Sequence, residues 1–128
     1  MKKLYSIVSV SILVCVVFSS CQKANLKDEN KAITLNVSLT PEQLYKLDLS
    51  QYGDADDIAS ISTQAEDFIT SEVNFDTSSQ KYFYTYTSSL NSKTALSKTE
   101  KVVLSVDEPA GRRHCDQTII TINITINE

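Results

Sequence analysis

The sequence predicts a small all-β sandwich that follows an N-terminal secretion signal. Three observations lead to this fold class. Apolar and polar residues alternate along several short segments, as in strands that bury one face. Turn-forming residues separate these segments at intervals of about ten residues. The chain has 128 residues and no internal repeat, which predicts a single domain.

The first twenty residues have the composition of a signal peptide. Lys2 and Lys3 provide a positive start, and residues 4–18 form an apolar run. Fifteen residues in a helix span roughly 22 Å, which is shorter than the roughly 30 Å hydrocarbon core of a bilayer. We therefore expect residues 1–20 to be removed as a signal peptide rather than to span a membrane.

The apolar run ends in Phe18-Ser19-Ser20-Cys21, and the chain turns polar immediately afterwards. This motif resembles the lipobox of bacterial lipoproteins, and Phe or Leu before Ser-Ser-Cys is frequent in those of the Bacteroidota. The resemblance implies that Cys21 becomes the first mature residue and carries a diacylglycerol and a further acyl chain such as palmitate. Several acyl chains hold a protein firmly on a membrane. We expect a lipid anchor at the outer membrane, on its surface or its periplasmic face.

Residues 21–31 are expected to form a flexible tether, and residues 32–128 the sandwich. Residues 22–31 contain one leucine among mostly charged and amide side chains, too little apolar surface for a core. Removal of residues 1–20 takes away two lysines and no acidic residue, which lowers the formal net charge from −4 to −6. This acidic balance argues against binding of nucleic acid.

The clearest strand signals lie at residues 33–39, 44–49, 82–87, 101–106 and 120–127. Residues 40–43 could form one helical turn capped by Thr40.

Residues 56–69 are ambiguous. Their apolar residues have helical spacing, but the Ser and Thr residues between them are poor helix formers. We predict strands there, and a single helix near 56–69 is the alternative.

Residues 84–86 (Tyr-Thr-Tyr), 99–102 (Thr-Glu-Lys-Val) and 118–127 follow one another as three strand segments. This order is similar to that of the immunoglobulin-like and cadherin-like domains of bacterial surface proteins. The resemblance covers residues 45–127 and lacks the glycine that usually precedes the Thr-acid pair. It implies an immunoglobulin-like β-sandwich and no particular activity.

Residues 112–116 contain the only histidine and, once Cys15 is removed and Cys21 is lipidated, the only remaining cysteine. Neighbouring residues of an extended chain point in opposite directions, so His114 and Cys115 are poorly placed for a catalytic pair. Zinc needs three or four ligands, which consecutive residues cannot supply. We expect no catalytic residue, no bound metal and no cofactor. Cys115 either stays free or pairs with a partner.

Two groups of residues could bind a ligand. Asp54, Asp56 and Asp57 follow Gly53 in a turn, where a calcium site would need several oxygens, and a solvated turn is the favoured interpretation.

Tyr82, Tyr84 and Tyr86 share one face of a strand and could present an aromatic strip to a glycan or a protein. Cross-strand packing in the core is the favoured interpretation.

These observations predict a lipid-anchored envelope protein that is not an enzyme. Its domain would serve as an interaction or structural module with a protein partner in the envelope. The alternative is a surface module that binds glycan or calcium through the tyrosines or the aspartate turn.

Overall fold

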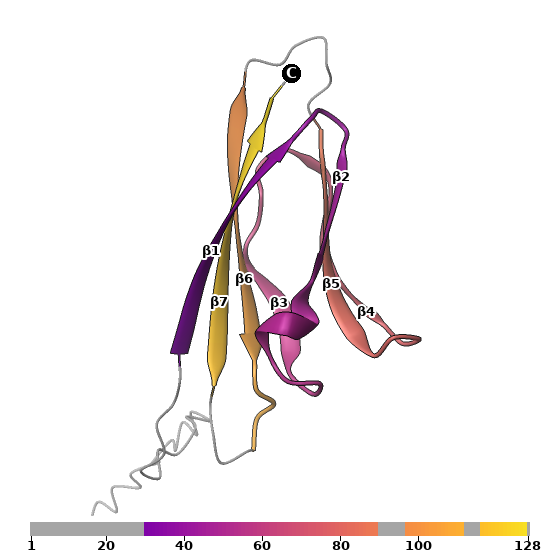
Figure 1. Cartoon of the computed structure of the whole chain (residues 1–128), viewed down its shortest axis with the longest axis vertical. Helices are drawn as coiled ribbons and strands as arrows, with labels where there is room; N and C mark the ends of the chain where they lie inside the picture. The colour runs from indigo at the N-terminus through magenta and orange to yellow at the C-terminus, as the bar shows by residue number, and fades with distance from the viewer. Residues whose placement is uncertain (1–29, 90–96, 112–115, 128) are drawn as a thin grey trace, which may run out of the picture.

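The computed structural model describes residues 30–89, 97–111 and 116–127, which form two packed β-sheets (Figure 1). The elements, in order, are β1 (Asn30–Leu39), β2 (Leu44–Asp48), the 3-10 helix η1 (Leu49–Tyr52), β3 (Ile58–Thr63), β4 (Phe68–Asp76), β5 (Lys81–Ser88), β6 (Lys98–Asp107) and β7 (Gln117–Ile126). The predicted all-β sandwich is confirmed. No helix among these residues is long and apolar enough to cross a membrane.

One sheet has the strand order β1-β7-β6-β3 and the other β2-β5-β4. β1 runs parallel to β7, and every other pair is antiparallel. When the strands are lettered A to G along the chain, the sheets are A-G-F-C and B-E-D. This is the immunoglobulin-like strand order, with the first strand paired to the last one. β1 begins at Asn30, so the last two residues of the expected tether pair with β7.

The core lies between β6 and β7 of one sheet and β5 of the other. Alternate residues of each strand point inward, as the period of two predicts. Burial is complete or nearly so for Val102, Leu104, Val106, Ile120, Ile122, Ile124, Ile126, Tyr84 and Tyr86. The alternation seen in the sequence of residues 120–127 therefore marks one of the two central strands of the larger sheet.

The helix considered near 56–69 does not form. These residues make β3, a short connection and the start of β4. Their Ser and Thr side chains suit a pleated sheet, and β6 provides a pairing edge for β3 that a helix could not use.

The helical turn considered at residues 40–43 does not form either. Glu42 has a φ of 62°, and the Gln43 N–H donates to the Thr40 carbonyl at 3.2 Å, which makes a tight turn. Among the described residues, the one helical turn lies further along, at Leu49–Tyr52. There Asp48 caps it by accepting the Ser50 N–H at 2.9 Å.

Candidate functional site

The sandwich has two ends with different chemistry. β1 starts at one end with Asn30 and reaches the other at Leu39, and ten strand residues span about 33 Å. We call the end that holds Asn30 and the turn 53–57 the proximal end, and the end that holds the connections 40–43 and 64–67 the distal end. Figure 1 shows the proximal end at the bottom and the distal end at the top.

The aspartate turn at the proximal end is held by its own hydrogen bonds. The Asp57 Oδ2 atom accepts the Asp54 N–H at 2.7 Å, and the Asp57 N–H donates to the Asp54 carbonyl at 3.2 Å. A Cβ atom on Gly53 would lie 2.5 Å from Asp57 Oδ2 and 2.6 Å from Val106 Cγ1. Glycine is therefore needed because the Asp57 carboxylate and β6 approach the backbone closely.

A small hollow of about 180 Å³ adjoins this turn, below the roughly 300–1,000 Å³ of typical small-molecule pockets. Its lining is Lys31, Tyr52, Gly53, Asp54, Asp57, Val106, Asp116 and Thr118. Within residues 30–89, 97–111 and 116–127, no three His, Cys, Asp or Glu side chains are placed to hold a metal ion. Asp54 and Asp57 do come together, but one carboxylate closes the turn and Asp56 is exposed.

The three tyrosines of β5 face the interior of the sandwich. Tyr84 and Tyr86 have no exposed surface, and Tyr82 packs against the core. The Tyr84 hydroxyl lies 2.9 Å from the Ser71 hydroxyl, and desolvation raises the pKa of Tyr84 to about 12. Burial likewise raises the pKa of Tyr86. These side chains form core packing, the favoured interpretation, and not a strip open to a ligand.

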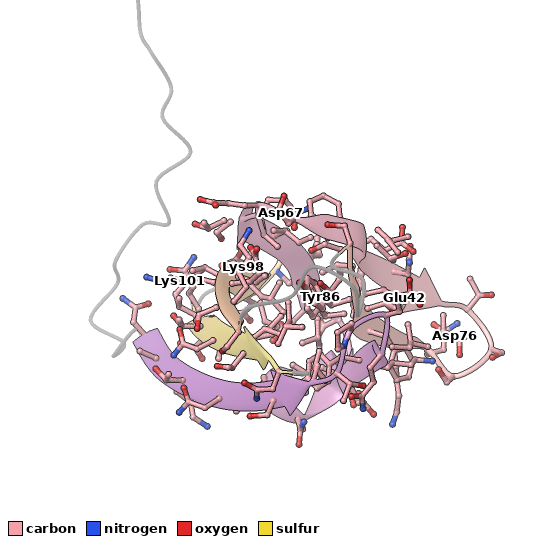
Figure 2. The ribbon with its side chains drawn as sticks, turned by 90° about the horizontal axis from the view of Figure 1, so that it is seen from above. Glu42, Asp67, Asp76, Tyr86, Lys98 and Lys101 are labelled. Carbon is pink, nitrogen blue, oxygen red and sulfur yellow. The ribbon has the colours of Figure 1, made fainter. Side chains whose placement is uncertain are left out.

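The distal end contains a buried carboxylate that sequence reasoning missed. Glu100 of β6 is only 2% exposed. Its Oε2 atom accepts the Glu66 N–H at 2.8 Å, and its Oε1 atom forms an ion pair with Lys98 Nζ at 2.8 Å. Lys98 also pairs with Asp67. Figure 2 shows Lys98 and Asp67 close together at this end, with Tyr86 between the sheets.

Hydrogen bonds hold the connection between β3 and β4 at several points. The Gln64 Nε2 group donates to the Ser71 carbonyl at 3.0 Å, and Gln64 Oε1 accepts the Ala65 N–H at 3.0 Å and the Ser71 hydroxyl. The Tyr86 hydroxyl donates to the Asp67 carbonyl at 3.4 Å. This connection joins the two sheets, and the network holds its backbone in one conformation.

Three exposed apolar residues of the described ranges lie at the distal end, at the starts of β2 and β4. We use the name distal patch for the exposed apolar residues at this end of the two outer strands of the smaller sheet, Leu44 of β2 and Phe68 and Ile69 of β4, which are 62%, 37% and 64% exposed. Leu44 and Thr70 both pair with Thr87, from opposite sides, so they lie about 10 Å apart on one sheet. The exposed acidic residues Glu42 and Glu66 lie in the neighbouring connections.

A register shift creates the exposed position in β4. The period of two predicts that Ile69, Ser71, Val73 and Phe75 share a face, and the last three do lie opposite inward-facing tyrosines. The shift between Phe68 and Thr70 leaves Ile69 outside this pattern. The signal that could have revealed it is the doublet Phe68-Ile69, because two adjacent apolar residues of a strand cannot both face the core.

Three residues of the sequence-based hypotheses lie outside the described ranges. They are Cys21, the expected lipidation site, and His114 and Cys115. The structure consequently places neither the anchor nor the lone thiol.

Comparison with known proteins leaves the chain without an assigned family. No protein-family model matches it, and no curated protein is significantly similar to it in sequence. A functional proposal therefore rests on the residues and the geometry given above.

Proposed function

We propose that the chain is a lipid-anchored protein of the bacterial cell envelope whose β-sandwich is a non-enzymatic interaction module. The observation that carries the proposal is the apolar run ending in Phe18-Ser19-Ser20-Cys21 directly before a polar segment. The outer membrane is the expected location, in line with the resemblance to Bacteroidota lipoproteins. Only eight residues separate Cys21 from Asn30, so the start of β1 would lie close to the membrane.

The distal patch is the surface that we propose meets a protein partner. Exposed apolar side chains on a backbone that is already ordered lose little conformational entropy on binding. The flanking acidic residues Glu42 and Glu66 favour a partner with an apolar socket and basic side chains around it.

The alternative, a module that binds glycan or calcium, has less support. The tyrosines proposed for a glycan pack in the core, and the Asp57 carboxylate is occupied by the turn that it closes. The proposed protein-binding role does not require the tyrosines of β5 or the Asp57 carboxylate to be accessible.

The anchor is tested by replacing Cys21 in the producing bacterium. We expect Cys21→Ala to abolish the acyl mass on the N-terminal peptide and to move the protein from the membrane to the soluble fraction. Cys115→Ala is the matched control, because it removes the other cysteine of the mature chain and should leave fractionation unchanged. An unmodified Cys21 thiol on native membrane-bound protein would overturn the proposal.

The distal patch is tested by photocrosslinking in whole envelopes. A photoreactive amino acid at position 69 should give one discrete crosslinked product, which mass spectrometry then identifies. The same amino acid at exposed position 72, on the same strand, is the control and should give none. Equal crosslinking from both positions would contradict a specific surface at the distal patch.

A further inference from the structure

The two sheets have four edge strands, and three of them carry a feature that discourages pairing with another chain. β2 has only five residues and includes Lys46. β3 and β4 each contain a register shift, between Ile61 and Thr63 and between Phe68 and Thr70. Short strands, charged residues and bulges are the usual protections of sheet edges.

β1 lacks such protection. It pairs with β7 in unbroken register over all ten residues, and among the residues that the structure describes its other side has no neighbour in the sheet. It contains no proline, and its single charged residue, Lys31, lies next to its first residue. A long, regular edge with a single charge near one end is the kind that accepts another strand.

One hydrogen bond shows which backbone groups of β1 are free for pairing. The Leu39 carbonyl accepts the Asn127 N–H at 2.9 Å, so the backbone groups of Leu39 point toward β7. Strand residues alternate in this respect, and Val37, Leu35 and Ile33 therefore also point toward β7. The backbone groups of the residues between them point to the open edge; these residues are Ala32, Thr34, Asn36 and Ser38.

The side chains of β1 divide in the same way. The residues whose backbone groups face the open edge have exposed polar or small side chains. Leu35 and Val37 pack against the core but stay partly exposed, since no strand lies beyond them. A further strand with the same alternation would extend the polar face and cover these apolar side chains.

We propose that the open edge of β1 binds β1 of a second copy of this chain, antiparallel, about a two-fold axis at Leu35. In this register Leu35 lies opposite Leu35 of the partner subunit, and Ile33 opposite Val37 of the partner subunit. Thr34 and Asn36 of the partner subunit form a hydrogen-bonded pair, because the backbone groups of both face the edge. The two larger sheets become one continuous sheet of eight strands.

The sequence of β1 favours a second copy over an unrelated strand. Antiparallel pairing about Leu35 sets Leu35 against Leu35 and Ile33 against Val37 on the inner face, and Thr34 against Asn36 and Ala32 against Ser38 on the outer face. Lys31 lies opposite Leu39 of the partner subunit, so the only charged residues of the two strands stay at opposite ends. A slip by one residue would oppose residues whose backbone groups face the edge with residues whose groups face β7, so the hydrogen-bond ladder could not form.

The mass of the unlipidated protein, residues 22–128, tests the proposal by sedimentation equilibrium over about a hundredfold range of concentration. The wild-type mass should rise from one protomer to two. Thr34→Pro removes an edge N–H without touching the β7 ladder and should stay at one protomer. Thr34→Val keeps that N–H and is the matched control, which should still dimerise. Circular dichroism establishes that each variant is folded.

If Thr34→Pro fails to fold, the double variant Thr34→Lys/Asn36→Lys replaces it. It brings like charges face to face in the proposed register and should also remain monomeric. A wild-type protein of one-protomer mass at every concentration, or a dimer that the folded edge variants leave intact, would overturn the proposal.

The register has its own test. Directly opposite residues in a non-hydrogen-bonded antiparallel pair have Cα atoms about 4.5 Å apart, which suits a disulfide. In a Cys115→Ala background, Leu35→Cys should therefore give a disulfide-linked dimer under mild oxidation. Ile33→Cys should not, because that residue faces Val37 of the partner subunit. Equal linkage at both positions would contradict the proposed axis.

Discussion

At the scale of single residues, Glu100 is the buried charge on which the distal end depends. It accepts the Glu66 N–H and pairs with Lys98, and it is almost fully buried. A buried carboxylate is tolerated only when hydrogen bonds and an opposite charge compensate for the loss of water. Its role is therefore to tie the β3–β4 connection to β6.

We expect Glu100→Ala to lower the free energy of unfolding by about 2–4 kcal/mol, because it leaves the Glu66 N–H without its acceptor and Lys98 with one carboxylate fewer. Glu100→Gln keeps an acceptor for that N–H and should cost less, about 1 kcal/mol. Urea unfolding measures both values. Glu72→Ala, at an exposed position, is the control and should change little. If the Gln and Ala variants lowered the free energy of unfolding equally, the hydrogen bond from the Glu66 N–H would not contribute to stability.

Tyr84 provides the second prediction at this scale. Because its ring has no exposed surface, Tyr84→Ala should destabilise the fold by about 3–5 kcal/mol. Tyr84→Phe removes only the hydroxyl that contacts Ser71 and should cost about 1 kcal/mol. Thermal or urea unfolding checks the two values. A Tyr84→Ala protein as stable as the wild type would contradict core packing.

At the scale of elements, η1 shows how a short helix can be held by one carboxylate. The Asp48 carboxylate accepts from the Ser50 hydroxyl, from Lys81 Nζ at 2.9 Å and from the Ser50 N–H at 2.9 Å. These contacts lower the pKa of Asp48 from its ordinary value of 3.8 to about 2. The stabilisation is therefore present above about pH 4 and is lost as the pH falls toward about 2.

We expect Ser50→Ala to raise the pKa of Asp48 toward its ordinary value, since it removes the hydroxyl donor and leaves the N–H and Lys81. A carboxyl-detected NMR titration measures this pKa directly. Ser60→Ala, at an exposed serine of β3, is the control. An unchanged Asp48 pKa in Ser50→Ala would show that the hydroxyl does not stabilise the carboxylate.

At the scale of the whole molecule, the fold depends on contacts between distant parts of the chain. The parallel pair of β1 and β7 joins Asn30 to Gln117 and Leu39 to Ile126. Two strands that are far apart in the chain must be brought together before their pairing stabilises the fold. Folding that depends on such pairs is therefore slow.

We therefore expect residues 22–128 to refold in milliseconds to seconds rather than in microseconds. Stopped-flow fluorescence of the tyrosines after dilution from urea measures the rate. A chain that starts at residue 40 lacks β1 and is the comparison; it should be less stable, because one side of β7 loses its partner. Sub-millisecond refolding of the longer chain would contradict a fold controlled by long-range pairing.

The sequence predicted some features of the candidate site and missed others. The interior position of Tyr84 and Tyr86 was the favoured interpretation, because alternating aromatic residues in a strand usually pack on one face. Glu100 and the distal patch were missed. Glu100 alternates with Val102 on a strand whose inner face looks apolar, and nothing local shows that Lys98 and the Glu66 N–H meet it there.

The sequence by itself determined where most strands of this protein lie, outside the ambiguous residues 56–69, and which face of β5 and β7 is buried. The reason is that the alternation of side chains between the two faces of a strand depends only on neighbouring residues. It is the same whichever strand lies alongside. The tertiary structure alone decided the parallel pairing of β1 with β7, the shift that exposes Ile69, and the burial of Glu100. These features arise from contacts between residues far apart in the chain, which no local pattern encodes.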